Sequence, residues 1–189
     1  MTVAEEKKAL RRTMLALRQA IPDEERRAAD AALCAILGSH PAFLAADLIL
    51  AFSPVRGEPD LRPLYEKAIA LGKAVAFPVC VGHEMTFHTV PALDALQAGR
   101  FGIPTPSETA PLADLTARTL CLMPGLAGGK DGTRLGYGGG FYDRFLDTFA
   151  GITLFPVYER LLLPTLPTEA TDHRVAHLVT EKGEIPLYA

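Results

Sequence analysis

Two amphipathic helices are predicted at the start of the chain. Apolar residues recur at helical spacing over residues 2–19, where Thr2 and Glu5 form a capping-box pattern in the first turn. A second helical pattern, rich in Ala, Glu and Arg, covers residues 23–37. From about residue 48, short and nearly continuous apolar runs replace the helical spacing. This change predicts that buried strands begin after the second helix.

Strands and helices alternate along the rest of the chain. Apolar runs predict strands at 48–52, 74–77, 85–88, 119–123, 152–158 and near 175–179. Helices are predicted at 60–71, with Asp60 as a candidate cap and Gly72 as the end, and at 141–149, while 93–99 is a turn or short helix. The alternation predicts an α/β fold with a mostly parallel sheet flanked by helices. No repeat or low-complexity linker divides the chain, so a single domain over 1–189 is expected.

Two loops are expected at one edge of this sheet. Residues 53–60 directly follow the strand ending at Phe52, and a glycine-rich run directly follows the strand ending at Met123. Ligands of open parallel sheets gather outside the carboxyl ends of the strands. The two loops are therefore the first place to look for a binding site.

Glycine is concentrated in the second of these loops. Eight of the sixteen glycines lie between residues 125 and 140, interleaved with or followed by Lys130, Arg134 and Arg144. Glycine at this density costs chain entropy, so a compact domain keeps it mainly where the backbone takes left-handed torsions or approaches a ligand closely. A helix beginning at Phe141 would add oriented N–H groups and a positive dipole end. The run is interpreted as an anion-binding turn, with phosphate as the favoured ligand.

Two familiar nucleotide motifs do not fit this run. A P-loop requires Ser or Thr after Gly-Lys, but Gly129-Lys130 is followed by Asp131, and Pro124 stands where the first glycine belongs. A dinucleotide fingerprint beginning at Gly136 meets Phe141 in place of its third glycine. Both motifs are excluded.

The first helix carries cations beside its apolar stripe. At about 100° per residue, Lys7, Arg11 and Arg18 fall in a narrow wedge that borders Leu10, Met14 and Leu17. The wedge directs these cations toward the body of the protein. From spacing alone two interpretations stay open, because the cations either snorkel along the edge of a surface helix or bind an anion.

Composition excludes several classes of function. The 189 residues are 49% hydrophobic and 22% charged, and the formal net charge of −3 gives no reason to expect nucleic acid. The apolar stretches are far shorter than a membrane span, and the first residues lack the apolar core of a signal peptide. The odd number and apolar neighbours of Cys34, Cys80 and Cys121 indicate buried thiols in a reducing compartment. Cytoplasmic localisation is expected.

The histidines and candidate nucleophiles carry little signal. His173 and His177 stand four residues apart, but Val175, Leu178 and Val179 indicate a strand there, and a His-Glu-x-x-His pattern is absent. Neither histidine is expected to bind zinc. No nucleophile elbow is present, so no catalytic triad is predicted.

The glycine run has the pattern of a known enzyme family. Its second half reads Arg134-Leu-Gly-Tyr-Gly-Gly-Gly-Phe-Tyr-Asp-Arg144. It resembles the signature of the 5-formyltetrahydrofolate cyclo-ligases, also called methenyltetrahydrofolate synthetases, which is roughly Pro-Gly-Leu-Ala-Phe-Asp, a spacer, then Gly-x-Arg-Leu-Gly-Tyr-Gly-Gly-Gly-Tyr-Tyr-Asp-Arg. The chain departs at Gly128-Gly129, where Phe-Asp is usual, and at Phe141, where Tyr is usual. The resemblance extends from Lys7 to the region of His173 and implies a three-layer α/β fold like that of the CoA-transferase and ribose-phosphate-isomerase group.

The resemblance implies an ATP- and Mg²⁺-dependent enzyme. The implied reaction is the irreversible cyclisation of 5-formyltetrahydrofolate to 5,10-methenyltetrahydrofolate, with ADP and phosphate released. Family members begin with a Lys-x-x-x-Arg helix that reaches the ATP phosphates, and Lys7 and Arg11 match it, which leaves Arg12 and Arg18 as solvated charges. The implied ATP-binding residues are Lys7, Arg11, Arg134, Leu135, Gly136, Tyr137, Gly138, Gly139, Gly140, Phe141 and Tyr142.

The folate site is implied at both loops. Val55, Glu58 and Asp60 match the family's folate-binding loop, and a carboxylate there can accept the paired N–H donors of a pterin. The alternative from the residues alone is that Asp60 caps the next helix and Glu58 is a turn residue. The glycine turn contributes the other implied substrate-binding residues, which are Tyr137, Gly138, Gly139, Gly140 and Phe141.

Two acids match the family's magnesium ligands. Asp143 is the acid nearest the glycine turn, and Asp172 matches a second acid near the metal, although a helix or turn cap is the alternative for Asp172. Mg²⁺ prefers one or two carboxylates together with phosphate oxygens and water. Arg134 and Asp143 are the expected catalytic residues, because phosphoryl transfer depends mainly on positioning and charge neutralisation. No covalent enzyme intermediate is expected. Tyr142 either contacts the ligand or belongs to the core.

Two alternative functions stay open from the sequence. One is a family relative that acts on another formylated or thiamine-related substrate, which the Gly128-Gly129 departure leaves open. The other is a non-catalytic protein that binds 5-formyltetrahydrofolate, although a pure folate binder has no use for triphosphate contacts. The expected partners are ATP and 5-formyltetrahydrofolate, with neither nucleic acid nor a membrane, and a monomer is expected.

Overall fold

A computed structural model of the protein describes residues 2–187 and is built around a seven-stranded sheet. The strand order is β12-β11-β9-β6-β1-β2-β3. Strands β11, β9, β6, β1 and β2 are parallel to their neighbours, and β12 and β3 add antiparallel edges. Their bounds are β1 Leu48–Leu50, β2 Ala74–Val81, β3 Glu84–Val90, β6 Thr119–Leu122, β9 Ile152–Pro156, β11 His177–Thr180 and β12 Gly183–Ile185. The predicted mostly parallel sheet is confirmed.

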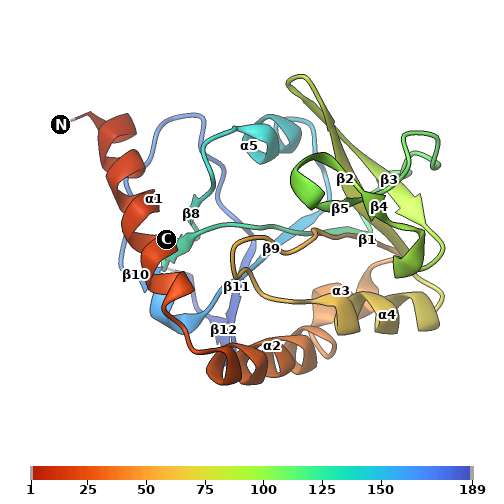
Figure 1. Ribbon diagram of the computed structural model, residues 1–189, viewed down its shortest axis with the longest axis horizontal. Helices are drawn as coiled ribbons and strands as arrows, with labels where there is room; N and C mark the ends of the chain where they lie inside the picture. Colours follow the sequence, from red (N-terminus) through yellow and green to blue (C-terminus); the bar gives the residue numbers. More distant parts are fainter. Residues whose placement is uncertain (1, 188–189) are drawn as a thin grey trace.

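Helices flank this sheet (Figure 1). They are α1 (Val3–Gln19), α2 (Asp23–Leu37), α3 (Pro41–Ala45), α4 (Arg62–Ala70) and α5 (Phe141–Leu146), with short 3-10 turns η1 (Leu93–Ala95), η2 (Arg100–Gly102) and η3 (Glu159–Leu161). In Figure 1, α2, α3 and α4 lie below the sheet, α5 lies above it, and α1 stands at the left. The predicted α/β arrangement of a sheet between helices is therefore confirmed.

The helix starts follow local sequence signals. Thr2 Oγ1 accepts the Glu5 N–H, and the Glu5 carboxylate accepts the Thr2 N–H at 2.8 Å, so the predicted capping box forms. Helix α2 has the predicted bounds. Helix α4 begins after Leu61 rather than at Asp60, although Asp60 Oδ1 accepts the Arg62 N–H at 3.1 Å just before the first turn. Helix α5 ends at Leu146, three residues before the predicted end.

Several short elements carry no periodic signal. Strands β7 (Ala127–Gly129), β8 (Arg134–Leu135) and β10 (Leu162–Leu163) form a separate three-stranded sheet, and β4 (Gln97–Ala98) and β5 (Pro104–Thr105) form a hairpin. The first half of the glycine run is thus the β7–β8 hairpin, and only residues 136–140 form the turn before α5. Two- and three-residue strands are too short to show alternation.

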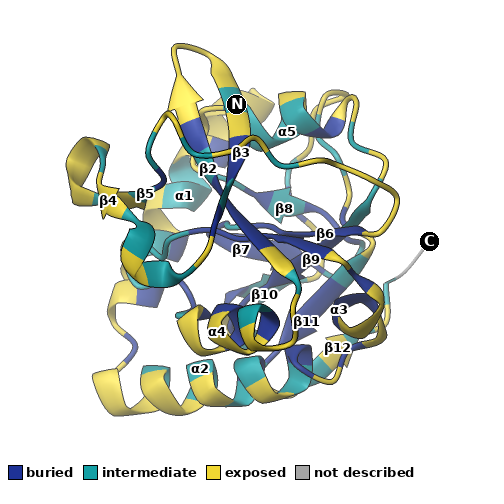
Figure 2. Cartoon of the chain, turned by 90° about the vertical axis from the view of Figure 1, so that its right-hand side faces the viewer, coloured by how far each residue is buried: buried dark blue, intermediate teal, exposed yellow. Residues whose placement is uncertain are grey.

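The central strands are buried, as Figure 2 shows in dark blue. Every residue of β1 and β6 is buried, as expected for parallel strands covered by helices. Cys121 of β6 is buried and Cys34 is half-buried, but Cys80 is exposed, so the prediction of three buried thiols is wrong there. Only residues 74–76 of β2 pair with β1, and Cys80 lies beyond them in the β2–β3 hairpin. Among residues 2–187, no helix has the length and apolar character needed to cross a membrane.

Strand order brings the two predicted loops together. Strand β1 lies between β2 and β6 and is parallel to both, with Leu50 paired to Cys121. After β1 the chain continues to β2 on one side of β1, and later it returns to β6 on the other side. Such a change of direction is a topological switch point, where open α/β sheets bind ligands. Residues 53–60 follow β1 and the glycine run follows β6, so both loops begin at this switch, as predicted.

Candidate active site

Glu58 joins the two loops. Its Oε1 accepts the Tyr137 hydroxyl at 2.8 Å, and its Oε2 accepts the Val55 N–H at 3.0 Å. Only 4% of Glu58 is exposed. The predicted folate loop and the glycine turn therefore meet through one buried acid, and Glu58 is more than an exposed turn residue.

Burial changes the acidity of Glu58. Removal from water raises the pKa of its carboxyl to about 7, although the Val55 N–H, the Tyr137 hydroxyl and the charges of Arg18 and Arg134 each favour the ionised form. The pKa of Tyr137 is also raised by burial and by the neighbouring Glu58. Glu58 thus titrates near neutral pH, which is typical of a functional acid.

Asp60 has a different environment from Glu58. Both of its oxygens accept hydrogen bonds from the Arg62 guanidinium, and this contact lowers the pKa of the Asp60 carboxyl. Of the two acids in the predicted folate loop, Glu58 is therefore the one that is buried and linked to the glycine turn.

Arg18 is fully buried, so the prediction of a solvated charge is wrong. Its Nη1 donates to Gly125 O at 2.8 Å, its Nε donates to Arg56 O at 3.0 Å, and its Nη2 donates to the Tyr137 hydroxyl at 2.5 Å. The helical wedge correctly directed Arg18 inward, but the partners come from two distant loops that helical spacing cannot locate. Arg12 is exposed, as predicted.

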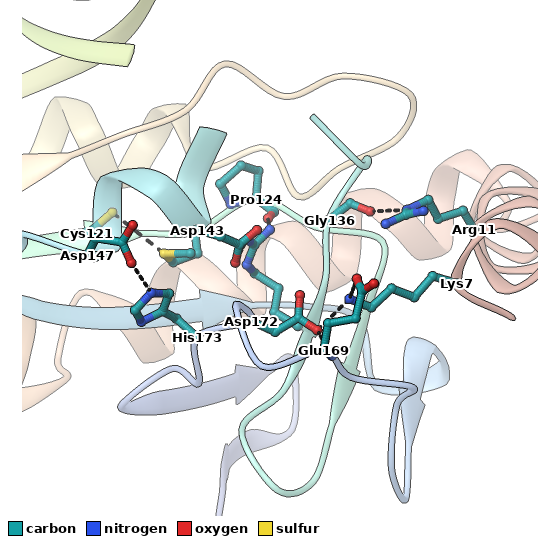
Figure 3. Close-up of polar contacts among 12 residues, drawn as sticks. Lys7, Arg11, Cys121, Pro124, Gly136, Asp143, Asp147, Glu169, Asp172 and His173 are labelled. Atoms are coloured by element: carbon teal, nitrogen blue, oxygen red, sulfur yellow. Dashed lines mark hydrogen bonds and ion pairs between the residues drawn. The ribbon is translucent and has the colours of Figure 1, made fainter. Parts of the chain in front are cut away.

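Lys7 is buried against two acids. Its Nζ lies 2.8 Å from Glu169 Oε2 and 2.5 Å from Asp172 Oδ2, and its side chain is 8% exposed (Figure 3). Burial disfavours the charge, but the hydrogen bonds to Asp172 and Glu169 outweigh it and raise the pKa of Lys7. The expected metal ligand Asp172 is therefore held by the expected phosphate ligand Lys7. Glu169 was missed, because an acid three residues before Asp172 in a loop shows no pattern.

Arg11 lies against the glycine turn. Its Nε donates to Gly136 O at 2.8 Å (Figure 3). A Cβ placed on Gly138 would lie 3.3 Å from Arg11 Cζ. The guanidinium therefore packs directly on the backbone of the turn.

The turn itself needs glycine at two positions. Gly138 and Gly140 have left-handed φ values of 97° and 65°. Leu135 is buried in β8, and the Arg144 guanidinium lies 5.1 Å from the centroid of the Phe141 ring. The interpretation that glycine permits left-handed torsions is confirmed at Gly138 and Gly140.

Arg134 lies under the turn beside Asp143. Its Nη1 donates to Pro124 O at 3.0 Å, its Nη2 is 3.4 Å from Asp143 Oδ1, and its buried Nε has no hydrogen-bond partner among residues 2–187. Its Cζ lies 5.5 Å from the Tyr142 ring centroid. The two expected catalytic residues are therefore neighbours. Tyr142 is also close, but its partly buried ring packs on Phe87 against the core, which is the arrangement of a core residue.

The departures at Gly128 and Gly129 lie outside the turn. Both are buried in β7, where a Cβ on Gly128 would be 3.1 Å from Leu162 and Leu178, and one on Gly129 would be 2.2 Å from Thr133 Oγ1. They accommodate the packing of the β7–β8 hairpin. These two differences from the family pattern therefore affect the β7–β8 hairpin that precedes the turn, and not the turn at residues 136–140 itself.

The histidines belong to other clusters. His173 Nε2 lies 3.0 Å from Asp147 Oδ1. Among the described residues, His40, His177 and Glu184 bring three ligand-type atoms within 4.8 Å of one another. His40 Nδ1 accepts the Ala42 N–H at 3.1 Å, so the neutral ring carries its proton on Nε2, which faces Glu184. A protonated nitrogen offers no lone pair, so His40 in this form supplies no metal ligand to the cluster, in which His177 Nδ1 lies 2.7 Å from Glu184 Oε1.

Curated relatives share the length and sequence of the chain. A 5-formyltetrahydrofolate cyclo-ligase of Mycolicibacterium smegmatis is 29% identical over 188 residues, which is 95% of each chain. One of Escherichia coli K12 is 28% identical over 171 residues, covering 86% of this chain and 93% of the relative.

Solved structures share its fold. The NMR structure of Aquifex aeolicus 5,10-methenyltetrahydrofolate synthetase has a TM-score of 0.85 and 32% identity, covering 97% of this chain and 93% of that one. A 5,10-methenyltetrahydrofolate synthetase of Mycoplasma pneumoniae has a TM-score of 0.76 and 18% identity, covering 93% and 99%, and supports the fold alone. Residues 3–181 match the family described as the 5-formyltetrahydrofolate cyclo-ligase family. The chain belongs to this family of enzymes.

Proposed function

We propose that the protein cyclises 5-formyltetrahydrofolate to 5,10-methenyltetrahydrofolate with ATP and Mg²⁺, releasing ADP and phosphate. The observation that carries the proposal is the junction of Glu58 with Tyr137, because it joins an acid suited to a pterin to a glycine turn suited to phosphate. Membership of the family supports the same reaction.

The proposed roles follow from the position of each residue. Glu58 accepts the pterin N–H donors, with Val55 packing beside the ring. Arg11 and Arg134 neutralise phosphate charge beside the turn, since Arg11 contacts Gly136 at the start of the turn and Arg134 contacts Pro124, which immediately precedes the glycine run. Lys7 exchanges its carboxylate partners for phosphate oxygens.

The proposed chemistry activates a poor electrophile. The formyl oxygen attacks the γ-phosphorus of ATP, the bond to ADP breaks, and the oxygen becomes part of a phosphate leaving group. N10 then attacks the formyl carbon and loses its proton, and phosphate departs as the ring closes. The protein's part is to hold both substrates in line and neutralise charge, so no covalent enzyme intermediate forms.

The residues proposed for Mg²⁺ fit its chemistry. Asp143 and Asp172 offer hard carboxylate oxygens, and their side chains are 30% and 20% exposed, so phosphate oxygens and water can complete the shell. Bound Mg²⁺ would neutralise phosphate charge. Arg134, already beside Asp143, would keep the acid oriented toward the turn.

The assay follows the absorbance of methenyltetrahydrofolate after mixing protein, 5-formyltetrahydrofolate, MgCl₂ and ATP, with an ATP-free control. ATP-dependent growth with one ADP per product supports the proposal. A flat trace from folded protein contradicts it, and binding of 5-formyltetrahydrofolate without turnover would favour a non-catalytic folate binder. Incubation with γ-labelled ATP tests the absence of a phosphoenzyme.

The setting proposed for this reaction is the cytoplasm, where thiols such as Cys34, Cys80 and Cys121, all free, remain reduced. We propose that the protein works as a monomer, because the loop after β1 and the glycine run, which meet at the site, come from one chain. Light scattering of the purified protein tests the oligomeric state.

A further inference from the structure

Arg18 is an arginine that the proposed reaction does not use. It is fully buried on α1, and its three donor contacts go to two distant loops, at Arg56 after β1 and at Gly125 and Tyr137 in the glycine run. A buried guanidinium is costly unless its charge and its N–H groups are compensated. Two of its partners are neutral carbonyls, and the third is a phenol that itself donates to the acid Glu58. The negative group nearest along this hydrogen-bonded chain is therefore Glu58.

We infer that Arg18 is a positioning residue of the folate pocket, which acts through Tyr137 to orient the Glu58 carboxylate. The inference rests on the proposed function, because it takes Glu58 as the acceptor for the pterin.

The direction of each hydrogen bond supports this role. Arg18 has only donors, so the Tyr137 oxygen must accept from it and the Tyr137 hydrogen is left to point at Glu58 Oε1. A hydroxyl that accepts from a cation is a stronger donor, because hydrogen bonds in a chain polarise one another. The Val55 N–H holds Oε2. One protein donor on each oxygen fixes the carboxylate plane and leaves lone pairs for a forked donor.

Arg18 also ties the two loops to the helix. Arg56 O belongs to the loop after β1, and Gly125 O begins the glycine run after β6. The guanidinium therefore sets the separation of the loops that carry Glu58 and Tyr137. This is a geometric role that a residue of similar charge but different shape cannot fill.

The groups that face Glu58 define the electrostatic consequence. They are the cations Arg18 and Arg134 and the hydroxyls of Tyr137, Tyr65 and Tyr142. Loss of the Arg18 charge removes one of the two cations that favour the ionised carboxylate, so the carboxyl would bind its proton more tightly. Folate binding should then require a higher pH.

A double-mutant cycle separates positioning from general stability. Arg18→Lys keeps the positive charge but loses the planar guanidinium with its several N–H donors, and Tyr137→Phe removes the hydroxyl alone. Each should raise the KM for 5-formyltetrahydrofolate about ten-fold, the loss of about one hydrogen bond to a charged group, with kcat within about three-fold of wild type. The double variant should be no worse than the more impaired single variant, because both break one chain. Arg12→Met, an exposed residue of the same helix, is the matched control and should leave the KM unchanged.

A pH profile gives the second readout. In Arg18→Met the acidic limb of kcat/KM for 5-formyltetrahydrofolate should move to higher pH, and in Arg18→Lys it should move less. A purely structural role would lower the Tm without moving this limb.

The outcomes are distinct. An unchanged KM in Arg18→Lys, or effects of Arg18→Lys and Tyr137→Phe that multiply in the double variant, would overturn the inference. If the Arg18 variants do not fold, an unchanged KM in Tyr137→Phe overturns it and a raised KM with a shifted pH limb supports it. Absence of turnover in the wild type contradicts the proposed function instead, and the same cycle measured as Kd for 5-formyltetrahydrofolate still tests Arg18.

Discussion

Glu58 combines two properties that oppose each other in the folded protein. Its burial favours the neutral acid and raises the pKa to about 7, whereas the Val55 N–H, the Tyr137 hydroxyl and the charge of Arg18 favour the carboxylate. A pterin offers N–H donors and needs the carboxylate. The free protein therefore holds this acid at a stability cost that ligand binding can relieve.

Glu58→Gln should change how stability depends on pH. The pKa of Glu58 is about 7 in the folded protein and near its ordinary 4.5 when unfolded, so the folded state binds more protons between these values and wild-type stability falls as pH rises through this window. The loss is at most about 3 kcal/mol. Glutamine has no charge to bury, so its stability should not fall in this way. The free energy of unfolding of Glu58→Gln, relative to that of wild type, should therefore be higher at pH 8 than at pH 5. Urea unfolding at both pH values measures this, and a constant difference would contradict the high pKa.

Asp143→Asn tests the magnesium role of a partly exposed acid. Turnover should fall by about a hundred-fold or more, because a neutral amide binds Mg²⁺ weakly, and more Mg²⁺ should be needed for half-maximal rate. The Tm should change little, since the contact with Arg134 is long at 3.4 Å. Asp147→Asn, one turn along and paired with His173, is the control. Equal losses in both variants would point to a general effect on α5.

Residue-level prediction succeeded where a motif or a periodic face defined the position. The wedge of α1 correctly directed Lys7, Arg11 and Arg18 inward, and two residues named from the motif, Arg134 and Asp143, lie side by side in the structure. It failed for the environment of Arg18, because the acceptors, two backbone carbonyls and the Tyr137 hydroxyl, lie far along the chain. Contacts of this kind depend on tertiary structure, which one helix cannot encode.

At the scale of elements, the turn at residues 136–140 depends on torsions that side chains resist. Gly138 has a φ of 97°, and a Cβ there would lie 3.3 Å from Arg11 Cζ. A substitution therefore disturbs both the backbone of the turn and the cation packed on it.

Gly138→Ala should raise the KM for ATP about ten-fold, because it shifts the turn away from Arg11, and should cost about 1 kcal/mol of stability. The KM for 5-formyltetrahydrofolate should change less. Gly82→Ala provides the matched control, since Gly82 also has a positive φ of 60° but lies in the β2–β3 hairpin with nothing within 4 Å of its Cβ. A similar loss of stability in both variants with an unchanged KM for ATP would rule out a phosphate role for the turn.

Long periodic elements were predicted well, and short ones were not. The bounds of α2 and the capping box of α1 were correct because the signals are local. The sequence predicts one continuous turn over residues 125–140, because glycines such as Gly128 and Gly129 are typical of turns. The structure instead has the β7–β8 hairpin there. The strand state of these two glycines comes from pairing with β8 and with β10, which lies about thirty residues later.

At the scale of the molecule, four segments build the candidate site. Helix α1, the loop after β1, the run after β6 and the loop before β11 meet through Lys7–Asp172, Arg11–Gly136, Arg18–Tyr137 and Tyr137–Glu58. All four contacts are polar, and each is only partly buried. A ligand that bridges the segments should therefore add substantially to the stability of the whole fold.

Thermal unfolding with MgATP tests this linkage. At about one hundred times its Kd, a ligand that binds only the folded state adds about 2.7 kcal/mol, which for a domain of this size raises the Tm by about 5 °C or more. EDTA should remove most of the increase if ATP binding requires Mg²⁺. Gly138→Ala should show a smaller increase than Gly82→Ala at the same ATP concentration, because only the first alters the turn. If 5-formyltetrahydrofolate raises the Tm while MgATP does not, the segments still form a folate pocket, but the glycine turn does not bind ATP in the absence of folate.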